Sequence, residues 1–226
     1  MVSSGMRWHW AYRWPPGIVL TTLRYFLCPP PIHRVDEHEA VLAPELPDAC
    51  GRGIQTIEQG TGRSFHRRYG VFITASRLEP EQIMGRLMAD PNAAVPPEIA
   101  LFETEDGHDT MRVGDELVVR MPGPWEGPVR VIHTSSTSFR LATLAGHFEA
   151  GQIEFRTVGD GEQLRFEIES WARCSDEVVN LLYDRLTLLR EMQTYLWARY
   201  CEQVCALCGG DPPRSVDVYT GCESQP

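Results

Sequence analysis

A histidine lies among glycines and carboxylates in the segment 146–154. Gly146 and His147 are followed closely by Glu149 and then by Glu154. Imidazole titrates near neutral pH and a nearby carboxylate can fix its tautomer, so these residue types suit general acid–base catalysis. The glycines favour a turn or bulge that would aim His147 at a cavity. The alternative is a hairpin corner, where His147 and Glu149 bond to the backbone and Glu154 pairs with an arginine on the outer sheet face.

Three cysteines, Cys201, Cys205 and Cys208, have the spacing of the radical SAM cluster motif. Such a cluster needs thiolates on an accessible loop, whereas these positions fall near the end of a predicted helix. With Cys222 as a fourth ligand, a zinc site is sterically feasible. On a helix, however, the three positions share one face, where buried thiols behave as small apolar side chains. We therefore predict no metal and no other cofactor.

The loop at residues 120–128 contains three prolines and one tryptophan, Trp125. Prolines lower the conformational entropy that a loop loses on binding, so this loop could present Trp125 to a ligand or partner. It could equally be a connector in which Trp125 covers one end of the fold. The sequence leaves both interpretations open.

Charge and composition exclude several classes of protein. The chain has 31 acidic and 21 basic residues, for a net charge of -10, and nucleic-acid binding depends on neutralising phosphates. We therefore expect no nucleic-acid partner. Every basic residue is arginine, so there can be no Schiff-base lysine and no P-loop lysine. This excludes pyridoxal enzymes, P-loop NTPases and standard kinases.

The cysteines and the N-terminal region bear on the compartment. The 7 cysteines are odd in number and scattered, unlike a secreted disulfide framework, which favours the cytoplasm. The apolar stretch 18–27 contains Arg24 and is shorter than the roughly 20 residues that span a bilayer, so no transmembrane segment is predicted. Tryptophans beside this stretch leave membrane-surface contact open, although packing onto its own domain is favoured.

Regular secondary-structure patterns begin near residue 65. The sequence predicts a strand over residues 68–76 and then a helix from 78 to about 88. Alternating or β-branched runs predict further strands at 99–103, 116–121, 129–134, 138–144, 152–158 and 163–173. In the last two runs apolar residues share one face and charged residues the other.

A long helix is predicted over residues 175–208. Ser175 is a good N-cap, Gly209 and Gly210 supply the stop, and an apolar stripe runs along the helix. That stripe must be buried, and the apolar face of the sheet is the available partner. We therefore predict an N-terminal arm over 1–64, with a short helix starting near Pro15 and Pro16. One α+β domain follows over 65–210, and then a tail over 211–226.

The order of these elements is that of helix-grip proteins. Residues 143–155 (TLAGHFEAGQIEF) are similar to the core motif of an uncharacterised family, the domain of unknown function nineteen-ninety. This family resembles a branch of the START-like (polyketide cyclase) superfamily. The resemblance spans about residues 65–205, because it also includes Gly114, the segment 127–131 and Trp171. It departs from the family at Gln152, where the family usually has an acidic residue. The resemblance implies a fold and a ligand cavity, but no established activity.

We predict a curved antiparallel sheet wrapped on the long C-terminal helix, with a small lipophilic ligand bound between them without catalysis. The predicted ligand-binding residues are Trp125, Phe139, Leu141, Phe155, Phe166, Leu189, Met192 and Leu196. One alternative is a cyclase or hydrolase that uses His147 with a carboxylate, Glu149 or Glu154. The other is a structural or interaction protein with a filled core, which docks partners through the tryptophan-rich arm or Trp125.

Overall fold

The computed structural model describes residues 29–36, 42–47, 50–97, 99–104, 108–121, 126–160, 163–175 and 188–223. Three predicted features lie outside these residues. They are the N-terminal helix with the apolar stretch 18–27, the Trp125 side of the proline-rich loop, and the first part of the long helix. The side chains of Leu189 and Cys222 are likewise outside the description.

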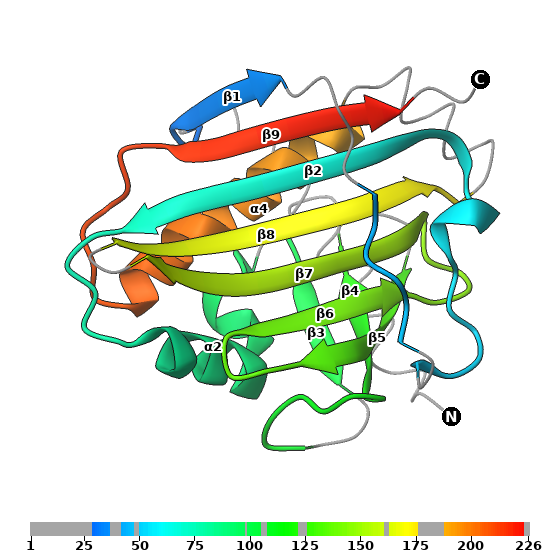
Figure 1. Ribbon diagram of the computed structural model, residues 1–226, viewed down its shortest axis with the longest axis horizontal. Coiled ribbons are helices and arrows are strands. Elements are labelled where there is room, and N and C mark those ends of the chain that lie inside the picture. The colour runs from blue at the N-terminus through cyan, green and yellow to red at the C-terminus, as the bar shows by residue number, and fades with distance from the viewer. Residues whose placement is uncertain are drawn as a thin grey trace.

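Nine strands of the described chain form one sheet, in the order β1-β9-β2-β8-β7-β6-β5-β4-β3 (Figure 1). All neighbouring strands are antiparallel except β1 and β9, which run parallel. The strands are β1 (Ile32–Asp36), β2 (Thr61–Ile73), β3 (Leu101–Thr104), β4 (Glu116–Arg120), β5 (Glu126–Thr134), β6 (Ser138–Thr143), β7 (Glu149–Asp160), β8 (Gln163–Cys174) and β9 (Val216–Glu223). The predicted antiparallel sheet is therefore confirmed, with one parallel pair at its edge.

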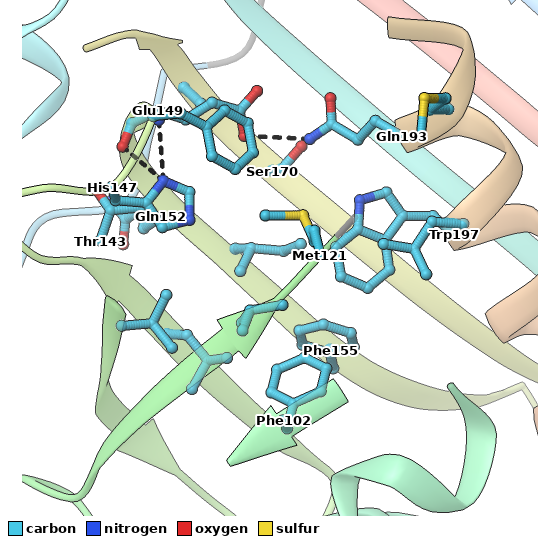
Figure 2. Close-up of a pocket in the computed structure, with 18 of the residues that line it drawn as sticks. Phe102, Met121, Thr143, His147, Glu149, Gln152, Phe155, Ser170, Gln193 and Trp197 are labelled. Atoms are coloured by element: carbon cyan, nitrogen blue, oxygen red, sulfur yellow. Dashed lines mark hydrogen bonds between the residues drawn. The ribbon is translucent and has the colours of Figure 1, made fainter. Parts of the chain in front are cut away.

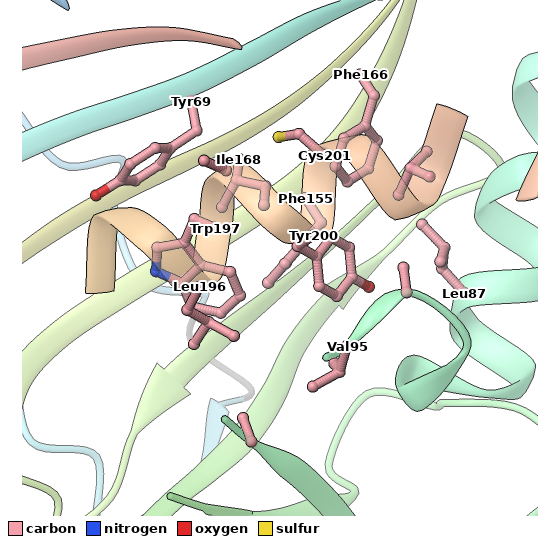
Figure 3. Packing of buried hydrophobic residues seen from close by; sticks show 14 of the residues in the cluster. Tyr69, Leu87, Val95, Phe155, Phe166, Ile168, Leu196, Trp197, Tyr200 and Cys201 are labelled. Atoms are coloured by element: carbon pink, nitrogen blue, oxygen red, sulfur yellow. The ribbon is translucent and has the colours of Figure 1, made fainter. Parts of the chain in front are cut away.

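Helix α4 (Leu188–Leu207) lies across one face of this sheet, as Figure 1 shows. Its buried side chains include Leu196, Tyr200 and Val204, which belong to the apolar stripe that the sequence predicts. Figure 3 shows Tyr200 and Trp197 of the helix packed among Phe155 and other side chains of the sheet. Ring contacts at 5.5 Å between Phe155 and Trp197 and at 5.6 Å between Phe155 and Tyr200 join the two layers. One sheet closed by one long helix is thus the observed architecture.

Three short helices of the described residues pack against the sheet or next to one another. Helix α2 (Pro80–Ala89) matches the predicted helix and buries Ile83, Met84 and Leu87. A capping box starts it, in which Glu79 and Gln82 satisfy each other's backbone N–H groups. Two 3-10 helices, η2 (Ile57–Gln59) and η3 (Pro91–Ala94), complete the order of elements. No helix within the described ranges is long and apolar enough to cross a bilayer.

The two ends of the predicted domain differ from the sequence analysis. Residues 216–223, predicted as tail, form β9, which lies between β1 and β2 inside the sheet. The side chains of Val216 and Val218 in β9 are buried in the hydrophobic core. Residues predicted as arm supply β1 at the edge, and β2 begins at Thr61, before the predicted boundary. The residues of strand β9 carry only a weak local signal for strand formation, and its pairing partners β1 and β2 are distant in sequence. The residue pattern alone therefore did not predict β9.

Candidate functional site

A cavity of about 130 Å³ lies between α4 and the sheet face that the helix covers (Figure 2). Strands β3 to β8 and helix α4 all contribute to its wall. The lining residues are Ile99, Phe102, Val119, Met121, Val129, Leu141, Thr143, His147, Phe148, Glu149, Gln152, Ile153, Phe155, Ser170, Ala172, Met192, Gln193, Leu196 and Trp197.

The cavity has an apolar end and a polar end. In Figure 2 the rings of Phe102 and Phe155 lie at one end, whereas His147, Glu149 and Gln193 lie at the other. The remaining wall is mostly aliphatic or aromatic, so most of the enclosed surface can contact only an apolar group. A mostly apolar pocket with a few converging polar groups is the usual form of a small-molecule site.

His147 lines the cavity from the turn that leads into β7. It is 8% exposed, and its ring stacks on Phe148 with centroids 4.6 Å apart. Its Nδ1 lies 2.9 Å from the backbone nitrogen and 3.0 Å from the backbone oxygen of Glu149. Gly127 in β5 lets the ring approach that strand, since a Cβ there would lie 3.2 Å from Nε2. Burial lowers the pKa of His147 to about 4, so the ring is neutral at physiological pH.

Neither candidate carboxylate holds the His147 ring. The Glu149 side chain lines the cavity and accepts a hydrogen bond of 3.1 Å from Gln193 of α4. Glu154 does not line the cavity, and its carboxylate lies 3.4 Å from the guanidinium of Arg156. The hairpin-corner interpretation thus matches the geometry: His147 contacts the Glu149 backbone, and Glu154 pairs with an arginine.

Arg156 belongs to a buried charge network on the face of the sheet opposite the cavity. Its guanidinium lies 2.6 Å from Glu169 and 2.7 Å from Glu167. The other oxygen of Glu169 is 2.7 Å from Nε2 of His66, and the His66 ring stacks on Trp171. Burial alone would raise the pKa of Glu169, but the hydrogen bond from His66 and the Arg156 charge outweigh it and lower that pKa. We expect this network to stabilise the folded protein.

The predicted lining residues fall into three groups. Leu141, Phe155, Met192 and Leu196 line the cavity. Phe139 and Phe166 are buried in the core without lining it, and Phe139 stacks on Phe155 with centroids 4.7 Å apart. Trp125 and the side chain of Leu189 lie outside the described residues, so their roles stay predictions.

Sequence reasoning missed four polar or amphipathic residues of the cavity wall, namely Thr143, Ser170, Gln193 and Trp197. Strand alternation does place Ser170 on the inner face, because it is two residues beyond the inward-facing Ile168. Trp197 follows Leu196 directly and therefore falls beside the predicted stripe. A search for polar residues on apolar faces would have found Ser170.

The three C-terminal cysteines lie in the core. Cys201, Cys205 and Cys208 are buried free thiols. Burial raises the pKa of each of them, for Cys205 to about 12, so they are protonated at neutral pH. Within the described residues no group of three His, Cys, Asp or Glu side chains is arranged to hold a metal ion. The interpretation of these thiols as apolar helix-face side chains agrees with this burial.

We expect Cys201 and Cys205 to resist alkylation by iodoacetamide in the folded protein, because thiolates react and these thiols are buried and protonated. Half-buried Cys50 serves as the internal comparison and should react first. Peptide mapping by mass spectrometry after timed labelling at pH 8 measures each site. Equal labelling rates for Cys205 and Cys50 would contradict the buried placement of α4.

A family model named "Domain of unknown function (DUF1990)" matches residues 96–203. This match is shorter than the predicted resemblance and leaves β1, β2 and β9 outside it. It covers the strands β3 to β8 and most of α4, which build the cavity. No curated protein matches the sequence.

The chain is similar to several solved structures at low sequence identity. The di-domain ARO/CYC StfQ from the steffimycin biosynthetic pathway is 8% identical, with a TM-score of 0.50 over 68% of this chain and 52% of that protein. The present chain thus spans about half the length of that protein. Norcoclaurine synthase from Thalictrum flavum is 15% identical, with a TM-score of 0.47 over 76% of this chain and 98% of that one. A hypothetical protein from Helicobacter pylori is 9% identical, with a TM-score of 0.47 over 76% and 99%.

At these identities the structural likeness shows the fold and nothing further. The sheet wrapped on a single long helix, the match to the family model and the likeness to StfQ agree with one another. The chain is therefore similar to the DUF1990 family over residues 96–203, and its architecture is a helix-grip fold.

Proposed function

We propose that this protein binds a small lipophilic ligand in the cavity beneath α4, without catalysing a reaction on it. The observation that carries the proposal is the cavity of about 130 Å³, whose wall is mainly apolar and enclosed between helix and sheet. A ligand there would contact Leu141 and Phe155 from the sheet and Leu196 from the helix.

The energetic cost of an empty cavity supports ligand binding over a purely structural role. Apolar lining that faces water instead of a packed partner forgoes roughly 25 cal/mol per Å² of hydrophobic stabilisation. A structural protein gains nothing from keeping this space, whereas a binding protein recovers the cost when the ligand fills it.

The enzyme alternative is favoured by one observation, the position of His147 on the cavity wall. Proton transfer is most effective when the pKa of the catalytic group lies near the working pH. Burial places the pKa of His147 at about 4, and the described carboxylates do not orient its ring. These features make His147 a weak base, so we rank binding first.

The proposal is tested by native mass spectrometry of the full chain purified from its own host. We expect an adduct that organic extraction removes. The variant Ala172→Phe puts a ring into the cavity wall and should lose the adduct, because Ala172 lines the cavity.

The matched control is Ala145→Phe, since Ala145 is exposed and does not line the cavity. This variant should keep the adduct. If the wild type carries no adduct, the proposed function fails. If Ala172→Phe carries the same adduct as the wild type, the ligand binds elsewhere on the chain.

A further inference from the structure

Three polar groups around the cavity have no hydrogen-bond partner among the residues that the structure describes. Ser170 in β8 is 7% exposed, and its hydroxyl forms no such bond. Trp197 in α4 is 8% exposed, and its indole nitrogen Nε1 has no partner. The third is Nε2 of His147, whose other ring nitrogen is engaged by the Glu149 backbone. Leaving a buried polar group unbonded costs about 1–3 kcal/mol, and the indole Nε1 of Trp197 is such a group, so its place beside the Ser170 hydroxyl on the cavity wall points to a ligand that bonds it.

These groups come from separate parts of the fold. Ser170 lies on a central strand, Trp197 on the helix, and His147 in the turn before β7. In Figure 2 the indole nitrogen of Trp197 lies toward Gln193 and away from Phe102. The three groups are therefore associated with the polar part of the wall, and the apolar end is left to Phe102 and Phe155.

The hydrogen-bonding types of these groups specify their complement. An indole N–H can only donate, and a serine hydroxyl can donate as well as accept. Nε2 of a neutral imidazole donates or accepts according to the tautomer. A ligand oxygen that accepts hydrogen bonds satisfies Trp197 and Ser170 together, whereas His147, on the other side of the cavity, can meet a second polar group or a water molecule.

The charge of the wall selects against an ionised ligand. Glu149 carries the one carboxyl group among the described lining residues, burial keeps His147 neutral, and no described arginine lines the cavity. A carboxylate ligand would lose its hydration and find no cation in the described wall, which is costly in a buried site.

We infer that the ligand is an uncharged, mainly apolar molecule with a hydroxyl or ketone oxygen, which Trp197 and Ser170 hold by hydrogen bonds. The inference rests on the proposed function, since it concerns the same cavity. The apolar part of the ligand would lie against Phe102 and Phe155.

Isothermal titration calorimetry of the full chain with three matched probes tests this inference. The probes are naphthalene, 2-naphthol and 2-naphthoate, which share one ring system and differ in the polar group. We expect 2-naphthol to bind about tenfold more tightly than naphthalene, which corresponds to one or two net hydrogen bonds. We expect 2-naphthoate to bind at least about tenfold more weakly than 2-naphthol, because the anion finds no cation.

Two serine variants locate the effect. Ser170→Ala should weaken 2-naphthol binding about fivefold and leave naphthalene binding within about twofold. Ser138→Ala is the matched control, because Ser138 lies in β6, its hydroxyl bonds to the hydroxyl of Ser135 in the preceding turn, and it does not line the cavity. This control should bind both probes as the wild type does. Naphthalene binding reports whether the cavity is still formed. A folding defect in Ser170→Ala would therefore be recognised as a loss of naphthalene binding.

The outcomes separate the inference from the proposed function. Equal binding of naphthalene and 2-naphthol would overturn the inference, since a water molecule would then be meeting the polar groups, while the proposed function would stand. Tightest binding by 2-naphthoate would overturn the claim of an uncharged ligand. If no probe binds, the inference fails, and the adduct measured by native mass spectrometry decides the proposed function separately.

Discussion

Gly151→Ala is expected to lower the free energy of unfolding by about 4 kcal/mol, or to prevent folding altogether. Gly151 lies in β7 with φ +153, and a Cβ built on it would lie 2.0 Å from the carbonyl oxygen of Trp171. The next nearest atom, Cα of Ala172 at 2.9 Å, is also backbone of β8. Backbone of a central strand cannot move aside without breaking the pairing of β7 with β8, so the methyl group cannot be accommodated.

The position also supports the polar end of the cavity. The N–H of Gly151 donates to the hydroxyl of Thr143 at 2.9 Å, and Thr143 lines the cavity. A shift of β7 away from β8 would therefore disturb the wall that holds the ligand. Urea unfolding followed by circular dichroism measures the loss, and thermal melts with and without 2-naphthol report the cavity.

The matched control is Gly85→Ala in helix α2. Nothing lies within 4 Å of a Cβ at Gly85, and alanine is favoured over glycine in a helix interior by about 0.5–1 kcal/mol. We therefore expect this variant to be slightly more stable than the wild type. A Gly151→Ala protein within about 1 kcal/mol of the wild type would show that β7 and β8 are not packed as closely as described.

Glu169→Ala is expected to cost about 3–5 kcal/mol, because it removes one partner of a buried ion network. Glu169 is 6% exposed and His66 is 2% exposed, so water cannot replace the lost carboxylate at His66. Arg156 keeps Glu167 at 2.7 Å, which moderates the loss on that side. Chemical unfolding at pH 7 measures the difference in the free energy of unfolding.

The same carboxylate contributes to acid unfolding. The pKa of Glu169 is lower in the folded protein than in the unfolded chain, where glutamate titrates at about 4.3. The contribution of Glu169 to stability is therefore present above about pH 4.3, and it is lost as the pH falls through the lower folded-state pKa. We expect Glu169→Gln to lose less stability than the wild type between pH 5 and pH 2.

Glu116→Ala serves as the control for both measurements. Glu116 pairs with Arg130, but its side chain is 47% exposed, so solvent screens the pair. Pairs of this kind contribute about 0–1 kcal/mol. A loss at Glu169 no larger than the loss at Glu116 would show that the His66–Glu169–Arg156 network is not shielded from water.

Local patterns in the sequence predicted the central elements of the fold well. Apolar and charged residues alternate through β7 and β8, and only one strand register buries Ile153 and Phe155 together. Proline and a reciprocal cap start α2, so this helix could also be read from a few neighbouring residues. The same alternation accounts for Glu154, which falls on the face opposite the cavity and pairs there with Arg156.

The sequence by itself determined the type of most elements, the buried faces of β7, β8 and α4, and the absence of lysine chemistry. Only the tertiary structure decided that β9 enters the sheet between β1 and β2, and that Ser170, Trp197 and His147 surround one cavity. The physical reason is the distance along the sequence between the residues that interact. Helix caps and strand alternation depend on residues a few positions apart, whereas strand order and the meeting of side chains from β8, α4 and a turn depend on how distant segments pack.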